Sequence, residues 1–396
     1  MSRYRLLPTP AQQAVLQGHC AHARYVWNLA VEQHAHWHPG RTNAPGYLEQ
    51  CRQLTAARKE HDWLRQGSQM VQQQALRDFA QAMAVFFDPA NTAGRPSWRK
   101  AGWDEGFRVV GRRGRQWDVR RLSRHVGQVW VPKAGWVHFR WSRAVPPGVK
   151  SYRVTMDRAG RWHVAFAAIP DPVSAPGNGQ VVGIDRGVAV SAALSTGELL
   201  HAPGLTARER IRLLRLERRL ARAQRGSNRR RRVRLAIARL KARQTDRRKD
   251  WAEKASTEIA RRFDLIRIED LQIANMTRSA KGTRENPGRN VRAKARLNLG
   301  ILASGWGLLV RRLEEKAPSR VEKIKPAFTS QRCSACGHVD ANSRESQARF
   351  ACTACGFAGH ADVNAAQNIA AGHAVTARGG DEVARPANRE PHLLAS

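Results

Sequence analysis

The sequence predicts a multidomain α+β protein, and three patterns lead to this prediction. Apolar residues recur at helical spacing near the N-terminus, they alternate with polar residues within residues 136–166, and an apolar strand follows the Pro/Gly/Ser/Asn-rich segment 171–179. With 396 residues, of which 42% are apolar, the chain is long enough for two or three domains that each bury a core.

The first quarter of the chain is predicted to be helical after one short strand. Residues 2–7 have strand character, and Thr9 then caps a helix whose first position is Pro10. A second helix over about residues 66–87 places its large apolar residues on one face: Val71, Leu76, Phe79, Met83 and Phe86. We therefore expect a small helical unit before the turn-like residues 94–100.

Alternating apolar residues next predict an antiparallel sheet. Residues 136–141, 152–156 and 162–166 have the period of two that is typical of strands, and the last two segments flank a turn at DRAGR. The expected product is a small barrel or a curved sheet that also contains the strand of residues 2–7.

The second half of the chain alternates between strands and helices. An apolar strand in VVGID is followed by another strand, and a buried strand is predicted in DLIRIEDL at 264–271. Helices are expected over 205–262, as an arginine-rich pair interrupted near 226–228, and over 291–317, as one amphipathic helix. A last helix begins in DVNAAQNIA, and residues 374–396 have the composition of a disordered tail.

The charge of the chain indicates a polyanionic partner. Lysine and arginine number 69 against 32 acidic residues, and the net charge of +37 would destabilise a compact fold by self-repulsion if no polyanion were bound. Nucleic acid is the expected partner, and the run RRRRVR in the long helical pair is expected to follow a phosphate backbone. Charge alone also fits a ribosomal or histone-like binder, although twelve tryptophans and 31 glycines indicate a folded protein rather than a basic tail.

The start of the chain carries no signal for export. MSRYRLLPTP is not followed by the apolar stretch of about 7–15 residues that a secretory signal needs. No segment approaches the ~18 consecutive apolar residues of a membrane span. We therefore expect a cytoplasmic protein without a membrane partner, in which paired cysteines are metal ligands rather than disulfides.

Four of the six cysteines have the spacing of a four-cysteine zinc ribbon. Cys333 and Cys336 form one C-x-x-C pair, fifteen residues follow, and Cys352 and Cys355 form the second pair. A glycine follows each pair and lets the backbone turn toward the sulfurs. Because four protein ligands leave Zn²⁺ no open position, the predicted zinc is structural.

The other cysteines and the nearby histidines have simpler interpretations. Cys20 and Cys51 are expected to be ordinary thiols buried by helices. His338 and His360 are expected to be polar surface residues rather than zinc ligands.

Three acidic residues lie at the ends of apolar elements in this basic chain. Asp185 and Glu269 each close a predicted strand, and Asp362 opens the last helix. Each has a purely structural alternative, as a turn residue, a helix start and an N-cap respectively. Together they are candidates for a shared site in which carboxylates bind two Mg²⁺ ions about 3.5–4 Å apart. Such ions could activate a water and stabilise the oxygen that leaves an attacked phosphodiester.

The motifs RLLPTPAQQ, IDRG, IEDLQIANM, FTSQRCSACG, CTACG and DVNAAQNI, in this order, resemble the TnpB family of insertion-sequence proteins. Its members are RNA-guided DNA endonucleases related to the small type V CRISPR effectors, and the resemblance extends from Arg5 to about Ile369. It implies an RNase H-like, RuvC-type nuclease domain with Mg²⁺ or Mn²⁺ at three catalytic acids, which map onto Asp185, Glu269 and Asp362.

The resemblance also implies a domain organisation. It comprises a β-barrel wedge, a helical recognition domain, a nuclease domain, an inserted zinc ribbon that binds target nucleic acid, and a disordered tail. The corresponding residues are 1–8 with 95–172, 9–94, 176–326 with 358–373, 327–357, and 374–396. The chain departs from the family pattern at Trp251 and Glu253, and at no catalytic position.

Guide RNA and target double-stranded DNA are the implied partners, in the prokaryotic cytoplasm at the nucleoid. One alternative is an RNA-guided repressor of the same fold that does not cut, and another is a miniature type V CRISPR effector with a CRISPR-derived guide. A DDE-type transposase would carry its acids in the order Asp, Asp, Glu, whereas here Glu lies in the middle. A structural RNA chaperone would show no metal-dependent cleavage.

Overall fold

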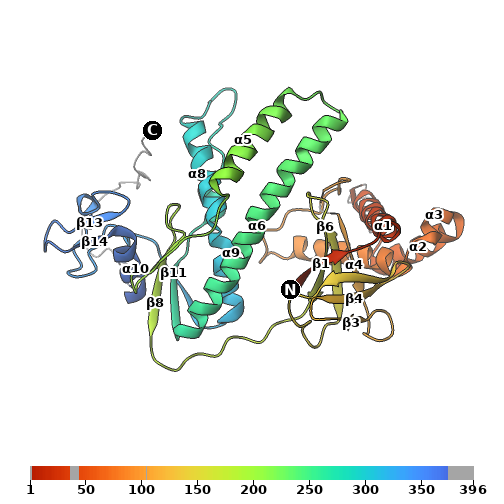
Figure 1. Cartoon of the computed structure of the whole chain (residues 1–396), viewed down its shortest axis with the longest axis horizontal. Coiled ribbons are helices and arrows are strands. Elements are labelled where there is room, and N and C mark those ends of the chain that lie inside the picture. Colours follow the sequence, from red (N-terminus) through yellow and green to blue (C-terminus); the bar gives the residue numbers. More distant parts are fainter. Residues whose placement is uncertain (1, 36–43, 104, 373–396) are drawn as a thin grey trace. The chain divides into compact units, whose positions relative to one another are not determined.

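Figure 1 shows the protein as a computed structural model, which describes residues 2–35, 44–103 and 105–372. The predicted disordered tail at 374–396 lies outside the described residues. Within the described part of the chain, no helix combines the length and the apolar character that crossing a membrane requires.

The chain divides into two compact units, which are described separately. One unit comprises Met1–Pro170 with Arg212–Ala242, and the other comprises Asp171–Ile211 with Arg243–Ser396. Helices and strands carry the labels of Figure 1.

Helices follow the first strand, as predicted for the first quarter of the chain, and their separation as a domain of their own stays a prediction. They are α1 (Pro10–Ala35), α2 (Tyr47–Glu60), α3 (Asp62–Gln66) and α4 (Gln69–Phe87). The start of α1 is as predicted, because the amide of Gln12 donates to Thr9 Oγ1 (3.3 Å) and the amide of Thr9 donates to Gln12 Oε1 (3.1 Å). This reciprocal pair satisfies two N–H groups that the first helical turn would otherwise leave without a partner.

The first unit also contains a seven-stranded antiparallel sheet. In sheet order the strands are β2 (Gly106–Val110), β6 (Ser151–Met156), β7 (Trp162–Ala167), β1 (Ser2–Leu7), β5 (Gly135–Arg140), β4 (Val126–Val131) and β3 (Val119–Arg121). As predicted, β1 belongs to this sheet, between β7 and β5. The predicted strands β5, β6 and β7 are confirmed, β2, β3 and β4 were not predicted, and closure into a barrel stays a prediction.

One core joins the helices of the first unit to its sheet. Leu16 of α1, Phe79 of α4, Phe139 of β5 and Phe166 of β7 are buried in the same apolar cluster. The ring of Tyr4 packs edge-on against Phe139 and Phe166, with ring centroids 5.3 and 5.5 Å away respectively. The N-terminal strand therefore supplies a central part of this core.

The second unit is built on a five-stranded mixed sheet. Its order is β10 (Leu199–Leu200), β9 (Ala192–Leu194), β8 (Val181–Asp185), β11 (Leu265–Glu269) and β12 (Val321–Ile324). β8 is antiparallel to β9, whereas β11 is parallel to both β8 and β12. The predicted strands β8 and β11 are confirmed, and β12 was missed. Because β8 and β11 are parallel neighbours, their last residues meet at one edge of the sheet.

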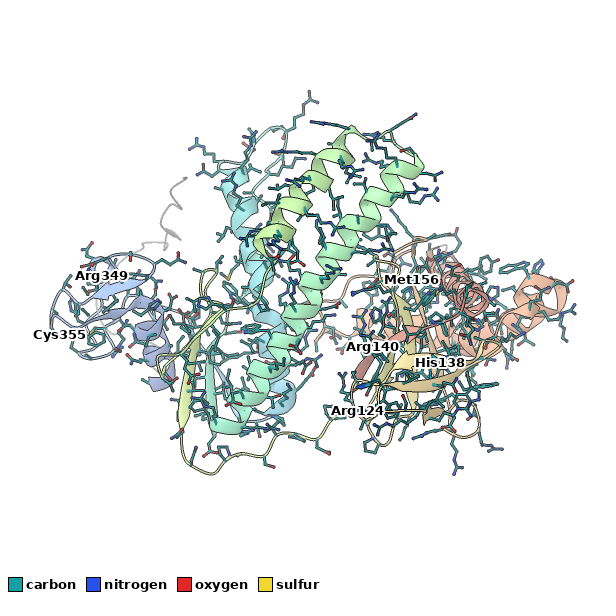
Figure 2. The ribbon with its side chains drawn as sticks, in the orientation of Figure 1. Arg124, His138, Arg140, Met156, Arg349 and Cys355 are labelled. Carbon is teal, nitrogen blue, oxygen red and sulfur yellow. The ribbon has the colours of Figure 1, made fainter. Side chains whose placement is uncertain are left out.

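The arginine-rich segment forms two helices, as predicted, α5 (Ala207–Arg222) and α6 (Asn228–Arg262). Within Arg212–Ala242 the helices pack through a small apolar cluster of Leu216, Val233, Ile237 and Leu240. In the second unit, Arg247 of α6 donates to both carboxylate oxygens of Glu209, at 2.6 and 3.0 Å. Figure 2 shows nitrogen-tipped side chains along both helices, which leaves a strongly positive surface.

The helix predicted over residues 291–317 is two helices, and the prediction of one continuous helix was wrong. α8 (Val291–Ser304) and α9 (Trp306–Lys316) are separated by Gly305, whose φ of 80° is left-handed. Arg248 of α6 donates to the main-chain oxygens of Leu302 and Ala303 (2.8 and 2.9 Å), which are free of helical partners at the end of α8. A short helix, α7 (Ile273–Met276), precedes this pair.

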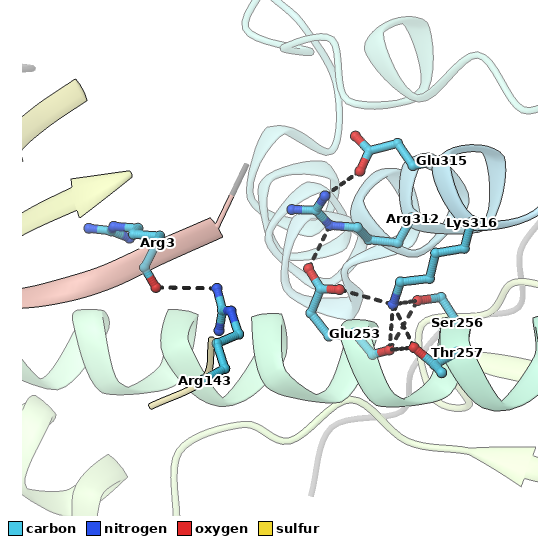
Figure 3. A network of polar contacts seen from close by, with 8 residues as sticks. All are labelled: Arg3, Arg143, Glu253, Ser256, Thr257, Arg312, Glu315 and Lys316. Atoms are coloured by element: carbon cyan, nitrogen blue, oxygen red, sulfur yellow. Dashed lines mark hydrogen bonds and ion pairs between the residues drawn. The ribbon is translucent and has the colours of Figure 1, made fainter. Parts of the chain in front are cut away.

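A network of ion pairs and hydrogen bonds connects α9 to α6 (Figure 3). The carboxylate of Glu253 pairs with Arg312 (2.8 Å) and with Lys316 (2.9 Å). Lys316 Nζ also donates to Ser256 Oγ (2.9 Å) and Thr257 Oγ1 (2.8 Å). Glu253, where the chain departs from the family pattern, is thus the centre of an inter-helix contact.

A small ribbon precedes the last helix. It contains a 3₁₀ turn (Ala341–Ser343) and the antiparallel pair β13 (Arg349–Ala351) and β14 (Ala358–His360). The last helix, α10 (Ala361–Ala371), begins directly after β14 and packs against β8 at Gly183.

Gly183→Ala is expected to destabilise the second unit by about 3 kcal/mol. A Cβ at this position would lie 2.0 Å from the main-chain oxygen of Ala366 and 2.3 Å from the main-chain nitrogen of Ala370. Main-chain atoms of a packed helix cannot turn aside as a flexible side chain can, so α10 would have to move off β8. Urea unfolding measures the loss.

Gly204→Ala is the matched control, because a Cβ there meets nothing within 4 Å. Its effect is expected to stay within about 1 kcal/mol. Equal losses in the two variants would contradict the close packing of α10 on β8.

Candidate functional site

The three acids singled out in the sequence lie at one edge of the second unit's sheet. Asp185 is the last residue of β8, and Glu269 is the last residue of β11. The residues before them, Ile184 and Ile268, are paired in register, so the two acids leave the sheet side by side. Asp362 reaches the same edge from the first turn of α10, which packs on β8.

Local geometry explains how Asp362 is placed. The N-cap of α10 is His360, whose Nδ1 accepts from the amide of Asp362 (3.2 Å). Asp362 is therefore not the N-cap, and its side chain is available to the site. Its Oδ2 lies 3.7 Å from the position that a Cβ on Gly187 would take, just beyond the end of β8.

The acids are electrostatically coupled. Burial, followed by the negative charges of Glu269 and Asp362, raises the pKa of Asp185 to about 8. Burial also raises the pKa of Glu269 and of Asp362. Three carboxylates with raised pKa values form a site that an added cation would stabilise.

Two arginines oppose this repulsion. Arg344, which lies in the ribbon between the two cysteine pairs, donates from Nη2 to Asp362 Oδ1 (3.1 Å). Its positive charge acts to lower the pKa of all three acids. Arg186, only 6% exposed, donates from Nη2 to the main-chain oxygen of Glu269 and so ties the end of β8 to the end of β11.

Thr329 is a further residue of the site. This buried side chain donates from Oγ1 to Glu269 Oε1 (2.6 Å) and fixes the orientation of the carboxylate. In turn, Asn368 of α10 donates to the main-chain oxygens of Thr329 (3.0 Å) and Arg332 (2.7 Å), and Asn364 also donates to Arg332 (2.7 Å). α10 therefore holds the chain segment that enters the ribbon.

Arg186, Arg344 and Thr329 were not among the site residues predicted from the sequence. An arginine directly after Asp185, at the end of an apolar strand, is a signal that could have identified Arg186, because a buried guanidinium needs nearby acceptors. Arg344 and Thr329 give no such signal, since their contacts join residues 18 and 60 positions apart.

Asp185→Asn is expected to raise the free energy of unfolding of the second unit when no divalent ion occupies the acidic site, and this gain should increase as pH rises from about 4 to 8. Asp185 ionises near pH 4 in the unfolded chain but near pH 8 in the folded one. Over this interval ionisation favours the unfolded chain, so the wild type loses stability as pH rises. The gain from asparagine should reach about 1–3 kcal/mol at pH 8 and vanish below pH 4.

Urea unfolding of the zinc-loaded protein, in buffer without Mg²⁺ or Mn²⁺ at pH 5 and pH 8, measures this difference. Asp270→Asn is the control, because it removes the neighbouring carboxylate, which is exposed to solvent rather than buried at the sheet edge. A gain that is the same at both pH values would contradict the coupled site.

The four paired cysteines form a second cluster. The Sγ atoms of Cys333, Cys336, Cys352 and Cys355 all lie within 4.8 Å of one another. Cys333 and Cys355 are 3.7 Å apart, and Cys336 and Cys352 are 3.6 Å apart. Zn–S bonds of about 2.3 Å in a tetrahedron place sulfurs about 3.8 Å apart, so the cluster fits Zn²⁺.

Both knuckles have the same backbone pattern. The amide of Gly337 donates to the main-chain oxygen of Cys333 (2.9 Å), and that of Gly356 donates to the main-chain oxygen of Cys352 (3.1 Å). Both glycines have left-handed φ values, 79° and 72°, which confirms their predicted role as turn residues. Figure 2 labels Cys355 in this ribbon, and His338 is exposed and outside the cluster.

The carboxylates are spaced more widely than the sulfurs. Among the described residues, the cysteines are the group of three or more candidate ligands whose donor atoms all lie within 4.8 Å of one another, and the three acids do not meet that spacing. Two ions about 3.5–4 Å apart are bound by different ligand atoms, so the carboxylate oxygens of a two-ion site can lie farther from one another than the four sulfurs around a single zinc.

Family models match three parts of the chain. The model OrfB_IS605, described as "Probable transposase", matches residues 163–280. A "Cas12f1-like, TNB domain" matches residues 306–369, and the "Helix-turn-helix domain" HTH_OrfB_IS605 matches residues 2–41.

Two curated proteins are similar to nearly the whole chain. The chain is 34% identical over 398 residues to "Putative RNA-guided DNA endonuclease InsQ" of Escherichia coli (strain K12), covering 98% of this chain and 96% of that protein. It is 32% identical over 387 residues to "Putative RNA-guided DNA endonuclease" of Streptomyces pristinaespiralis, covering 95% and 90%. A solved Cas12f1–sgRNA–target DNA complex is similar at 15% identity and a TM-score of 0.47, over 89% of this chain and 81% of that one.

Proposed function

The chain belongs to the TnpB family of insertion-sequence proteins, and from this premise we propose that it is an RNA-guided DNA endonuclease encoded by a transposon. The observation that carries the proposal is the convergence of Asp185, Glu269 and Asp362 at one sheet edge. We propose that these residues are the single catalytic centre, in a nuclease domain of RuvC type.

The donor set of this centre fits Mg²⁺ or Mn²⁺. Carboxylate oxygens are the ligands these hard cations prefer, and the raised pKa values of the three acids mark negative charge that divalent ions would balance. When bound, the ions would lower the pKa of an attacking water and stabilise the leaving oxygen of a phosphodiester.

Three side chains hold the carboxylates and the main chain of the proposed centre in place. Thr329 holds the Glu269 carboxylate, Arg186 holds the main chain beneath it, and Arg344 holds Asp362. The zinc ribbon, proposed to bind target nucleic acid, supplies Arg344 and leads directly into α10. Zn²⁺ would thus be a structural cofactor that helps to orient the centre.

The proposed partners are a guide RNA and a double-stranded target DNA. The net charge of +37 and the basic helices α5 and α6 support a channel for an RNA–DNA heteroduplex, held through its backbone rather than its sequence. In this proposal the helical recognition lobe (9–94) and the wedge (1–8 with 95–172) read a short motif in flanking duplex DNA. The protein would act on prokaryotic DNA at the nucleoid.

Plasmid cleavage tests the proposal. The protein is purified with its bound RNA, the RNA is sequenced, and a plasmid that carries the matching target is incubated with Mg²⁺ or with EDTA. Cutting only with Mg²⁺ and only at the matched target is expected. Matched binding without cutting in Mg²⁺ would instead identify an RNA-guided repressor, and a bound RNA with CRISPR repeats would identify a CRISPR effector.

A further inference from the structure

The first unit contains a cavity that the proposed catalytic centre does not use. It has a volume of about 510 Å³ and is open to solvent between α1 and α4 on one side and β2 and β6 on the other. The segment 97–103, which connects the helices to the sheet, forms its rim. Cavities of this size are typical of sites for small organic groups.

Two tryptophans of the rim are more than half exposed. Trp98 is 55% exposed and Trp103 is 54% exposed, although other tryptophans of this unit, such as Trp117 and Trp162, are almost completely buried. Exposed indole rings beside a cavity offer flat surfaces on which another aromatic ring can stack.

The segment that carries Trp98 is held firmly against α1. The amide of Arg99 donates to Asn28 Oδ1 (2.8 Å), and Asn28 Nδ2 donates back to the main-chain oxygen of Arg99 (3.0 Å). Trp27 Nε1 donates to the main-chain oxygen of Ser97 (2.9 Å). Trp98 is therefore presented between two fixed residues, so little ordering remains to oppose binding of a ligand.

The charge around the cavity is positive. Arg99, Lys100, Arg108 and Arg153 line it together with one acid among the described residues, Asp78. Asp78 pairs with Arg108 (3.5 Å) and with Arg153 (3.1 Å). Arg158 does not line the cavity, but its guanidinium lies 4.0 Å from the ring centre of Trp103, which does. A ligand with both a flat ring and a negative charge matches this combination.

We propose that this cavity receives one unpaired nucleotide of the bound nucleic acid, with the base stacked on Trp98 or Trp103 and the phosphate beside Lys100. The inference rests on the proposed function only in assuming that nucleic acid binds this unit. It adds a base-stacking site to the first unit, where charge alone would give only backbone contacts.

Binding of short labelled oligonucleotides tests the proposal. The full chain, freed of bound RNA in high salt, is titrated in EDTA at about 0.3 M KCl with a ten-nucleotide RNA, with a DNA of the same sequence, and with abasic versions of both. Wild type should prefer the base-bearing probes. Trp98→Ala or Trp103→Ala should weaken binding of the base-bearing probe by about tenfold and leave binding of the abasic probe unchanged.

Trp63→Ala is the matched control, because Trp63 is 43% exposed and does not line the cavity. It should keep the preference for bases, and circular dichroism verifies that each variant is folded. Loss on the abasic probe equal to that on the base-bearing one, or no loss in either cavity variant, would overturn the proposal. The probe, RNA or DNA, whose binding is weakened more by the cavity variants identifies the nucleic acid that supplies the unpaired nucleotide.

This outcome is separable from that of the proposed function. The binding assay contains no divalent ion and needs no cleavage. A chain that prefers bases but never cuts would refute the endonuclease alone, and a chain that cuts but shows no preference would refute the cavity alone.

Discussion

DNA cleavage should fall at least about a thousandfold when Asp185, Glu269 or Asp362 is replaced by its amide. A thousandfold loss corresponds to about 4 kcal/mol of transition-state stabilisation, a size expected when one carboxylate ligand of a metal centre is removed. Because the amides keep the shape of the acids, guide RNA binding should stay within about twofold of wild type. Plasmid cleavage and filter binding measure the two effects separately.

Asp270 supplies the control for this experiment. The sequence IED offers two neighbouring acids, but Glu269 is buried at the sheet edge while Asp270 is exposed. Asp270→Asn should therefore cut at nearly the wild-type rate. An Asp185→Ala chain that still cleaves, or an Asp270→Asn chain that does not, would reject the assignment of the catalytic centre.

Loss of zinc is expected to abolish cleavage through its effect on the ribbon. Cys352→Ser removes one of four ligands, and structural zinc contributes apparent binding free energies of about 10–16 kcal/mol in small zinc-binding peptides. Without it the ribbon should unfold, Arg344 should leave Asp362, and α10 should lose its N-terminal support from His360. Zinc release assayed with a metal indicator, together with plasmid cleavage, measures both losses.

Cys51→Ser is the matched control, because Cys51 lies in α2 of the first unit, outside the cysteine cluster. It should retain one zinc ion per chain and full cleavage. If a zinc-free Cys352→Ser chain cut at the wild-type rate, the ribbon would have no part in orienting the centre.

Local signals in the sequence predicted the two strands that carry Asp185 and Glu269, the start of the first helix, and the cysteine cluster. Apolar runs predicted β8 and β11, Thr9 and Pro10 predicted the start of α1, and cysteine spacing predicted the cluster that the structure contains. In each case the determinant lies within a few neighbouring residues, so it can be read from a short stretch of sequence.

Elements and contacts that depend on distant partners were not predictable in this way. β3 (VRR) contains one apolar residue, and β2 (GFRVV) alternates over only three residues, so neither is long enough to show a period of two by itself; they form strands by pairing with β4 and β6. The break at Gly305 looks like ordinary helix, because a single glycine is tolerated within an apolar pattern. The pairing of Arg344 with Asp362 requires the folded ribbon.

The attachment of the ribbon has a further consequence for how this protein can vary. Where the chain enters the ribbon, the side-chain amides of Asn364 and Asn368 donate to the main-chain oxygen of Arg332; where it leaves the ribbon, His360 caps α10. Both ends of the ribbon are therefore held by α10. Loops that are closed at the base can lengthen at the tip at small entropic cost. Insertions between the two cysteine pairs should therefore be tolerated over evolution, provided that an arginine still reaches Asp362, whereas insertions between His360 and Asp362 should not.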